Sequence, residues 1–181
     1  MSDVVPSELR HYIMSQVHSS STKPELKLRR ALWRLGFRYR INDRQLPGSP
    51  DIVLPKHRTV IFVHGCFWHG HKGCKHYTIP KTNVDFWTAK IARNQERDQE
   101  VWRSLEAKGW YVVIVWECEL KKNLFEDTIC RVEKEILANS ESYRRQIEDR
   151  RHLREQRRIE LREQKERQSA LMAEIKESHK V

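Results

Sequence analysis

One short segment of the chain carries residue types that bind metal ions. Residues 63–74 read VHGCFWHGHKGC. Within them, Cys66, His71 and Cys74 have the spacing C-x4-H-x2-C. A further thiol, Cys118, directly follows an apolar run that is expected to be a strand. Two thiolates and an imidazole from one loop, with a thiolate from a strand end, form a tetrahedral ligand set suited to a structural Zn²⁺.

The composition of this loop supports a metal rather than a disulfide. It contains three glycines and few residues for a core of its own, so a bound ion would supply the order. The N-terminus lacks a signal peptide, which favours a reducing compartment for the four cysteines. Two alternatives stay open: His76 in place of His71 as a ligand, and reduced cysteines without metal. Cys130, on an expected helix, is interpreted as a small buried hydrophobe.

A second group of side chains is suited to phosphodiester chemistry. Asp51 follows a turn and begins a strand, where metal nucleases place a carboxylate that holds Mg²⁺. His69 is not needed by the zinc set, so its imidazole could deprotonate an attacking water. His64 could stabilise charge on the phosphate. Asp98 lies on the apolar face of a long helix and could orient His69. The alternatives are an Asp51 that only ends a turn and an Asp98 that forms an i,i+4 salt bridge within its helix.

Two large aromatics lie inside the metal-binding loop. Phe67 and Trp68 are flanked by glycines and candidate ligands. Exposed aromatics on a rigid loop of a basic protein can insert between DNA bases, which costs a few kcal/mol of unstacking. The alternative is that both rings pack inward beneath the loop.

The elements expected to position these residues alternate between helices and strands. Residues 8–18 form a short predicted helix, and Thr22 and Glu25 form a capping box for the next one, which ends at Gly36. The expected strands are 37–41, 51–54, 59–63 and 110–116. A long helix is predicted over 86–108 with Asp85 as its cap, and another over 124–137. The prediction is an α/β sandwich around a mixed central sheet.

Charge and composition divide the chain. It has 35 Lys and Arg against 25 Asp and Glu, and its net charge of +10 suits a polyanionic partner. From Ser140 onward there are 12 basic and 9 acidic residues and few apolar ones. We expect one domain over 1–139 and a charged extension over 140–181, either a solvated helix or partly disordered, with a weak coiled coil as the alternative. No run is apolar enough to cross a membrane.

Taken together, these residues resemble the very short patch repair (Vsr) endonucleases over about Met14 to Lys121. The resemblance rests on several long strings of uncommon residues. They are TKPE (22–25), LPGSPD (46–51), FVHGCFWHGH (62–71), DFW (85–87), KIARN (90–94), RD (97–98) and VWEC (115–118).

The resemblance implies a variant of the PD-(D/E)xK restriction-endonuclease-like fold. It also implies a Mg²⁺-dependent enzyme that nicks one DNA strand 5′ to the thymine of a T·G mismatch left by deamination of 5-methylcytosine. The expected partners are mismatched double-stranded DNA, a cytosine-5 methyltransferase by functional link, and mismatch-repair proteins. A monomer in the bacterial cytoplasm is expected. This sequence lacks an acidic-x-Lys pair on its second strand, so a Lys-assisted mechanism is not expected.

The resemblance also assigns roles by position. Asp51 and the backbone carbonyl of Val63 would hold Mg²⁺, and Glu25 would approach its waters. His69 would be the general base, His64 an electrostatic helper and Asp98 the support of His69. The expected zinc ligands are Cys66, His71, Cys74 and Cys118. The aromatics expected to wedge into DNA are Phe67, Trp68 and Trp87, with Met14 entering from the other groove. Asn94 and Arg93 are candidate readers of flanking bases.

Two other classes of function remain open at this point. One is a sequence-specific or general DNA nuclease on the same fold without mismatch preference. The other is a zinc-stabilised DNA-binding module without catalysis, which the presence of both Asp51 and a spare His69 disfavours.

Overall fold

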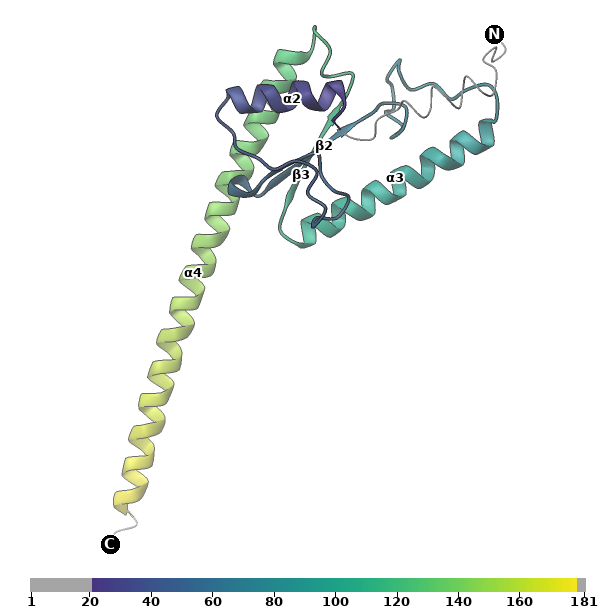
Figure 1. Cartoon of the computed structure of the whole chain (residues 1–181). Coiled ribbons are helices and arrows are strands. Elements are labelled where there is room, and N and C mark those ends of the chain that lie inside the picture. Colours follow the sequence, from purple (N-terminus) through teal and green to yellow (C-terminus); the bar gives the residue numbers. More distant parts are fainter. Residues whose placement is uncertain (1–20, 179–181) are drawn as a thin grey trace. The chain divides into compact units, whose positions relative to one another are not determined.

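A small mixed sheet lies at the centre of the fold (Figure 1). The computed structural model describes residues 21–178, with side chains up to residue 169. The strands are β1 (Ile52–Leu54), β2 (Thr59–His64) and β3 (Tyr111–Trp116). The helices are α2 (Lys23–Arg34), the short 3-10 turn η1 (Pro55–His57), α3 (Val84–Ala107) and α4 (Phe125–Ser178). The expected mixed α/β architecture is therefore confirmed for the described residues.

The register of the sheet decides which loops meet. The strand order is β1-β2-β3, with β1 antiparallel and β3 parallel to β2. In the parallel pair, His64 lies opposite Trp116 at the last position of each strand. Parallel neighbours end at the same edge of a sheet, so the segments that follow β2 and β3 start side by side. This edge brings Cys66 and Cys118 together.

Helices cover both faces of the sheet, as Figure 1 shows for α2 and α3. On one face, Ile61 and Val115 pack with Leu28 and Leu32 of α2 and with Val132 of α4. On the other face, a smaller cluster includes Val60, Phe62 and Leu105 of α3. Both faces of the sheet are buried, which explains why β2 reads as a continuous apolar run.

The predicted helix after Thr22 is confirmed together with its capping box. The Thr22 hydroxyl accepts from the Glu25 backbone N–H, and the Glu25 carboxylate accepts from the Thr22 N–H. The cap of α3 was predicted wrongly. Asn83, in a left-handed conformation with φ of 54°, precedes the first residue of that helix, and Asp85 lies within its first turn.

The strand predicted over 37–41 is also wrong. Only Arg40 pairs, through an isolated antiparallel bridge to Val53. Asn42 has a φ of 47°, which turns the chain away directly after that bridge. Alternating apolar residues were therefore not enough to form a strand here, because the neighbouring strand β1 has only three residues with which to pair. The prediction for Cys130 is wrong as well, since its side chain is exposed on α4.

The chain separates into two compact units, Met1–Ser140 and Glu141–Val181. In the second unit, α4 continues as a helix to Ser178, so the helical alternative describes residues 141–178. Nearly all its described side chains are exposed. Among the described helices, none is long and apolar enough to span a bilayer. The helix predicted over 8–18 lies outside the described residues.

Candidate metal and nuclease site

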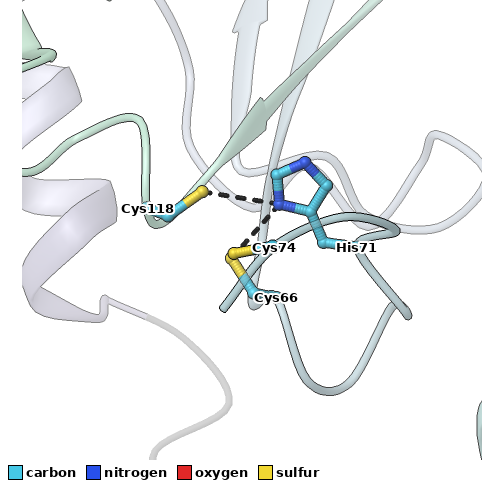
Figure 2. Close-up of side chains that lie close together, drawn as sticks. All are labelled: Cys66, His71, Cys74 and Cys118. Atoms are coloured by element: carbon cyan, nitrogen blue, oxygen red, sulfur yellow. Dashed lines mark hydrogen bonds between the residues drawn. The ribbon is translucent and has the colours of Figure 1, made fainter. Parts of the chain in front are cut away.

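Four side chains converge where β2 and β3 end (Figure 2). Cys66, His71 and Cys74 come from the loop after β2, and Cys118 comes from the turn after β3. One ligand atom from each lies within 4.8 Å of the others. Nδ1 of His71 is 3.5 Å from Sγ of Cys66 and 3.4 Å from Sγ of Cys118.

These separations fit a tetrahedral metal site. With Zn–S near 2.3 Å and Zn–N near 2.0–2.1 Å, sulfur and nitrogen ligands on a tetrahedron are roughly 3.5 Å apart. Burial raises the pKa of the Cys66 thiol to about 12 and also raises the pKa of the Cys118 thiol. The backbone N–H of His76 lowers the pKa of the Cys74 thiol. Three clustered sulfurs become thiolates together only when a cation lies between them, so the donor set fits a soft or borderline divalent ion.

The choice between His71 and His76 is decided by geometry. Nε2 of the half-buried His76 lies 2.6 Å from Nζ of Lys121, outside the cluster. The His71 ring stacks on Trp116, with centroids 4.1 Å apart and ring planes 3° apart. This stacking fixes the direction of Nδ1, so His71 is the imidazole of the candidate metal site.

The same loop carries a second cluster of side chains, besides the four candidate metal ligands. Nδ1 of His69 lies 2.5 Å from Oδ2 of Asp98 on α3. With the carboxylate as acceptor, Nδ1 carries the proton and Nε2 keeps a lone pair. The His69 side chain is 21% exposed, so water can reach the ring. An imidazole held in this way can accept a proton from water.

His64 stacks on His69, with ring centroids 3.7 Å apart and planes 15° apart. Ring-nitrogen lone pairs lie in the plane of each ring, so two parallel rings do not aim at one ion, although their atoms and those of Asp98 lie within 4.8 Å. Burial, and then the charge of His69, lower the pKa of His64 to about 3. His64 is therefore neutral at pH 7 and would meet an anion as a hydrogen-bond donor rather than as a cation.

Asp51 lies just before β1 and faces β2. Its Oδ2 accepts the backbone N–H of Val63 at 2.7 Å. Burial raises the pKa of Asp51 to about 6, against the opposing hydrogen bond from Val63; Glu25 raises it further, while Arg29 and His69 lower it. A buried carboxylate is a suitable donor for a hard divalent cation.

Glu25 is buried next to this group. Its carboxylate accepts from Nη2 of Arg29 at 2.9 Å and from the Ser21 backbone N–H at 2.9 Å. Arg29 also donates to the backbone carbonyl of Asp51 at 3.0 Å. Through Arg29, Glu25 thus links helix α2 to the start of β1, and its carboxylate contributes negative charge near Asp51.

Three aromatic rings form a cluster between the loop and α3. Phe67 lies 5.1 Å from Trp68 and 5.3 Å from Trp87 between ring centroids, and all three are half-buried. The rings meet edge to face, which stabilises aromatic clusters. The structure brings together the three aromatics that the sequence singled out, and it leaves part of each accessible.

Comparisons with known proteins agree with this geometry. The family model for DNA mismatch endonuclease Vsr matches residues 2–76. The Type II nicking enzyme V.NmeAIP of Neisseria meningitidis is 47% identical over 137 residues, which cover 75% of this chain and 97% of that protein. The chain belongs to the Vsr family. The DNA mismatch endonuclease Vsr of Escherichia coli is 41% identical over 121 residues, covering 67% of this chain and 77% of that protein.

Membership in the Vsr family makes this chain a DNA endonuclease, a hydrolase that acts on DNA. A second nicking enzyme, V.XorIIP of Xanthomonas oryzae, is 49% identical over 120 residues, covering 66% of this chain and 88% of that protein. The match to V.NmeAIP covers 97% of that protein but 75% of this chain, so a quarter of this chain has no counterpart in the match.

The structure of this Vsr chain adds positioning residues that sequence reasoning missed. Gln95 of α3 donates to the backbone carbonyls of His69 at 3.2 Å and Gly70 at 3.4 Å. Its neighbour Asn94 donates to the Trp68 carbonyl at 2.9 Å. This bond holds the loop, and the expected role of Asn94 as a reader of flanking bases stays a prediction. Polar residues on the core-facing side of a helix were the available signal.

Two other candidates for DNA contact have different outcomes. Arg93 is exposed, and its Nε donates to the Ala89 carbonyl within α3 at 3.3 Å. Met14 lies outside the described residues. Phe86, which sequence reasoning passed over, is 54% exposed, and its ring lies 5.1 Å from that of Trp87.

Proposed function

We propose that this Vsr-family endonuclease nicks one DNA strand 5′ to the thymine of a T·G mismatch and thereby begins very short patch repair. The supporting observation is the single loop after β2, which carries the His69 base and the Phe67 and Trp68 rings. A base and a mismatch probe on one rigid support would couple cleavage to the presence of a distorted base pair. The name of the E. coli relative supports mismatch specificity, while the nicking-enzyme relatives support cleavage of one strand.

In the proposed reaction, Nε2 of His69 accepts a proton from the water whose oxygen bonds to phosphorus. The bond between phosphorus and the 3′ oxygen of the preceding nucleotide breaks, and that oxygen takes a proton from solvent water to become a 3′-hydroxyl. Asp98 holds the imidazole in the required tautomer and supports the positive charge that it gains. His64 donates a hydrogen bond to the phosphate. Asp51 and the carbonyl of Val63 would hold Mg²⁺, with Glu25 near its waters. Magnesium would supply positive charge against the phosphate oxygens.

The metal cluster has a structural role in this proposal. Cys66, His71, Cys74 and Cys118 would bind Zn²⁺ with no ligand position left open, as in structural sites. The ion would fix the loop whose other residues touch DNA. We assign residues 1–139 to the nuclease domain, as a variant of the PD-(D/E)xK fold, and residues 140–181 to an extension.

The biological setting follows from the same proposal. T·G pairs that arise from deaminated 5-methylcytosine require a cytosine-5 methyltransferase in the same cell, which is the functional link that we propose, along with mismatch-repair proteins. The enzyme would act in the bacterial cytoplasm as a monomer.

The deciding experiment is a nicking assay on strand-labelled duplexes that differ at one base pair. With Mg²⁺, we expect the T·G duplex to be cut in the thymine strand and the C·G and T·A duplexes to be spared. Equal cutting of all three would instead assign the protein as a nuclease without mismatch preference. Tight binding with no cutting of any duplex would assign it as a binding module.

The role of the aromatic cluster has its own test. We expect Phe67→Ala to reduce the ratio of T·G to C·G cutting by about tenfold or more, because base-step insertion is worth a few kcal/mol. Trp33→Ala, which removes an exposed aromatic on α2, is the matched control and should leave the ratio unchanged. Wild-type discrimination in Phe67→Ala would overturn the wedge role.

A further inference from the structure

The helix of the second unit separates its two signs of charge. With about 100° of rotation per residue, eight of the ten basic residues in 141–169 fall within roughly 140° of the helix surface. All seven acidic residues of the same stretch fall within a similar arc on the opposite side. The two basic exceptions, Arg145 and Arg167, lie on the acidic side. We call the first arc, which runs from Arg144 to Lys165, the basic stripe.

Among the described side chains of 141–169, the ion pairs involve one residue of the basic stripe: Arg158 lies 3.9 Å from Glu155, while the other pair, Arg167 with Glu163 at 3.5 Å, lies on the acidic side. Opposite charges at i and i+4 stabilise an isolated helix. The basic stripe instead has arginines at four successive i,i+4 positions, and these pairs repel each other. They are Arg150, Arg154, Arg158 and Arg162. Like charges at this spacing weaken an isolated helix, so the stripe is better explained by an external anion than by helix stability.

The stripe is accessible and has almost no apolar component. Its basic side chains are all exposed. Only Ile147 and Leu161 share its arc, and they are separated by four turns of helix. A coiled-coil partner needs an apolar residue every three or four positions, and a membrane surface needs a continuous apolar face, so neither fits. A repeating array of anions fits both the charge and the length.

We propose that the basic stripe binds the phosphate backbone of duplex DNA independently of sequence. At 1.5 Å per residue, the stretch from Arg144 to Lys165 is about 32 Å long, close to one turn of B-DNA at about 34 Å. Arginine forms charge-assisted hydrogen bonds to phosphate oxygens. The family acts on DNA, so this anion is already the partner of the enzyme. The stripe supplies affinity, while the loop after β2 supplies the chemistry.

The test compares two double variants of the full-length protein with equal loss of charge. R151Q/R154Q removes two arginines from the stripe, and R145Q/R167Q removes two from the opposite side. Glutamine keeps the helix propensity of arginine, and circular dichroism would check that helicity is equal. Binding to a matched duplex and to a T·G duplex would be measured from about 50 to 200 mM salt.

Each phosphate contact contributes about 0.9 to the slope of log K against log[salt]. We expect R151Q/R154Q to reduce that slope by about 2 on both duplexes, so that its affinity loss over this salt range is about tenfold smaller than that of wild type. R145Q/R167Q should keep the wild-type slope. The single-turnover nicking rate at saturating DNA should be the same in all three proteins.

Two results would overturn the proposal. Equal slopes in both variants would show that the stripe does not contact DNA. Self-association of the wild type in sedimentation, lost in the variants without any change in DNA binding, would assign the stripe to the acidic side of a second copy.

Discussion

Nδ1 of His69 and Oδ2 of Asp98 are joined across the gap between the loop after β2 and helix α3. The loop alone cannot fix an imidazole, because glycines lie close on both sides of His69 in the chain. The hydrogen bond to a carboxylate on a rigid helix fixes both ring orientation and tautomer. Asp98 is therefore a positioning residue that acts through His69.

Replacing Asp98 tests this relationship. We expect Asp98→Asn to lower the single-turnover nicking rate about 10- to 100-fold while the DNA dissociation constant changes little. Glu100→Gln, an exposed acid on the same helix, is the control. A nicking rate in Asp98→Asn equal to that of wild type would remove its assigned role.

Metal content tests the cysteine cluster. We expect Cys74→Ala to lose the roughly one equivalent of zinc that a four-ligand site binds, and to lower the melting temperature, because the loop has no core of its own. Cys130→Ala removes an exposed thiol outside the cluster and should keep both zinc and stability. Elemental analysis and calorimetry measure the two quantities. Full zinc in Cys74→Ala would show that the cluster is not the site.

Two glycines in the same loop provide a matched pair. Gly70 and Gly73 have φ values of 64° and 73°, so alanine is strained at either position. A Cβ at Gly70 would also lie 2.4 Å from Nε2 of Gln95 and 3.0 Å from Cγ2 of Ile91, whereas at Gly73 nothing lies within 4 Å.

We expect Gly70→Ala to destabilise the protein by about 1–3 kcal/mol more than Gly73→Ala, which is the usual cost of overpacking. Gln95 can move aside only by losing its hydrogen bonds to the backbone of His69 and Gly70. Nicking should therefore fall more in Gly70→Ala. Chemical denaturation of both variants measures the difference in their free energies of unfolding. Equal values would show that the Gln95 side chain can move aside without destabilising the protein.

The raised pKa of Asp51 predicts a stability that depends on pH when no divalent cation is added. Its folded pKa of about 6 exceeds the ordinary aspartate pKa of 3.8, so the favourable contribution to folding is complete below pH 3.8 and is lost as pH rises through 6. Asp51→Asn stays neutral and keeps the Val63 hydrogen bond. We expect this variant to be more stable than wild type at pH 8 by about 3 kcal/mol.

The gain should disappear near pH 3.8, where wild-type Asp51 is also largely neutral. Urea unfolding of zinc-loaded protein at several pH values measures this difference. Nicking by Asp51→Asn should fall strongly at every pH, because a neutral amide would bind the proposed Mg²⁺ more weakly than a carboxylate. A constant stability difference across this pH range would show that ionising the buried Asp51 carboxyl group does not destabilise the folded protein.

Residue types and their spacing were enough to predict the chemistry available to this protein. The spacing of Cys66, His71 and Cys74 indicated a metal, and the Thr22–Glu25 pair predicted a capped helix that the structure contains. These features depend on neighbours in the chain, where residue type and spacing fix the geometry. The sequence also gives the charged residues of 141–169. Their separation onto two sides appears only when the segment is helical, because the helix sets the direction in which each side chain points.

Which of these groups lie close together depends on the folded chain. The parallel register of β2 and β3 placed Cys118 beside Cys66, and the stacking of Trp116 selected His71 over His76. The failed strand at 37–41 and the exposed Cys130 have the same origin. Strand pairing and burial depend on which residues lie nearby in space. The sequence pattern gives the preference of each side chain, but it does not show which neighbours that side chain will contact.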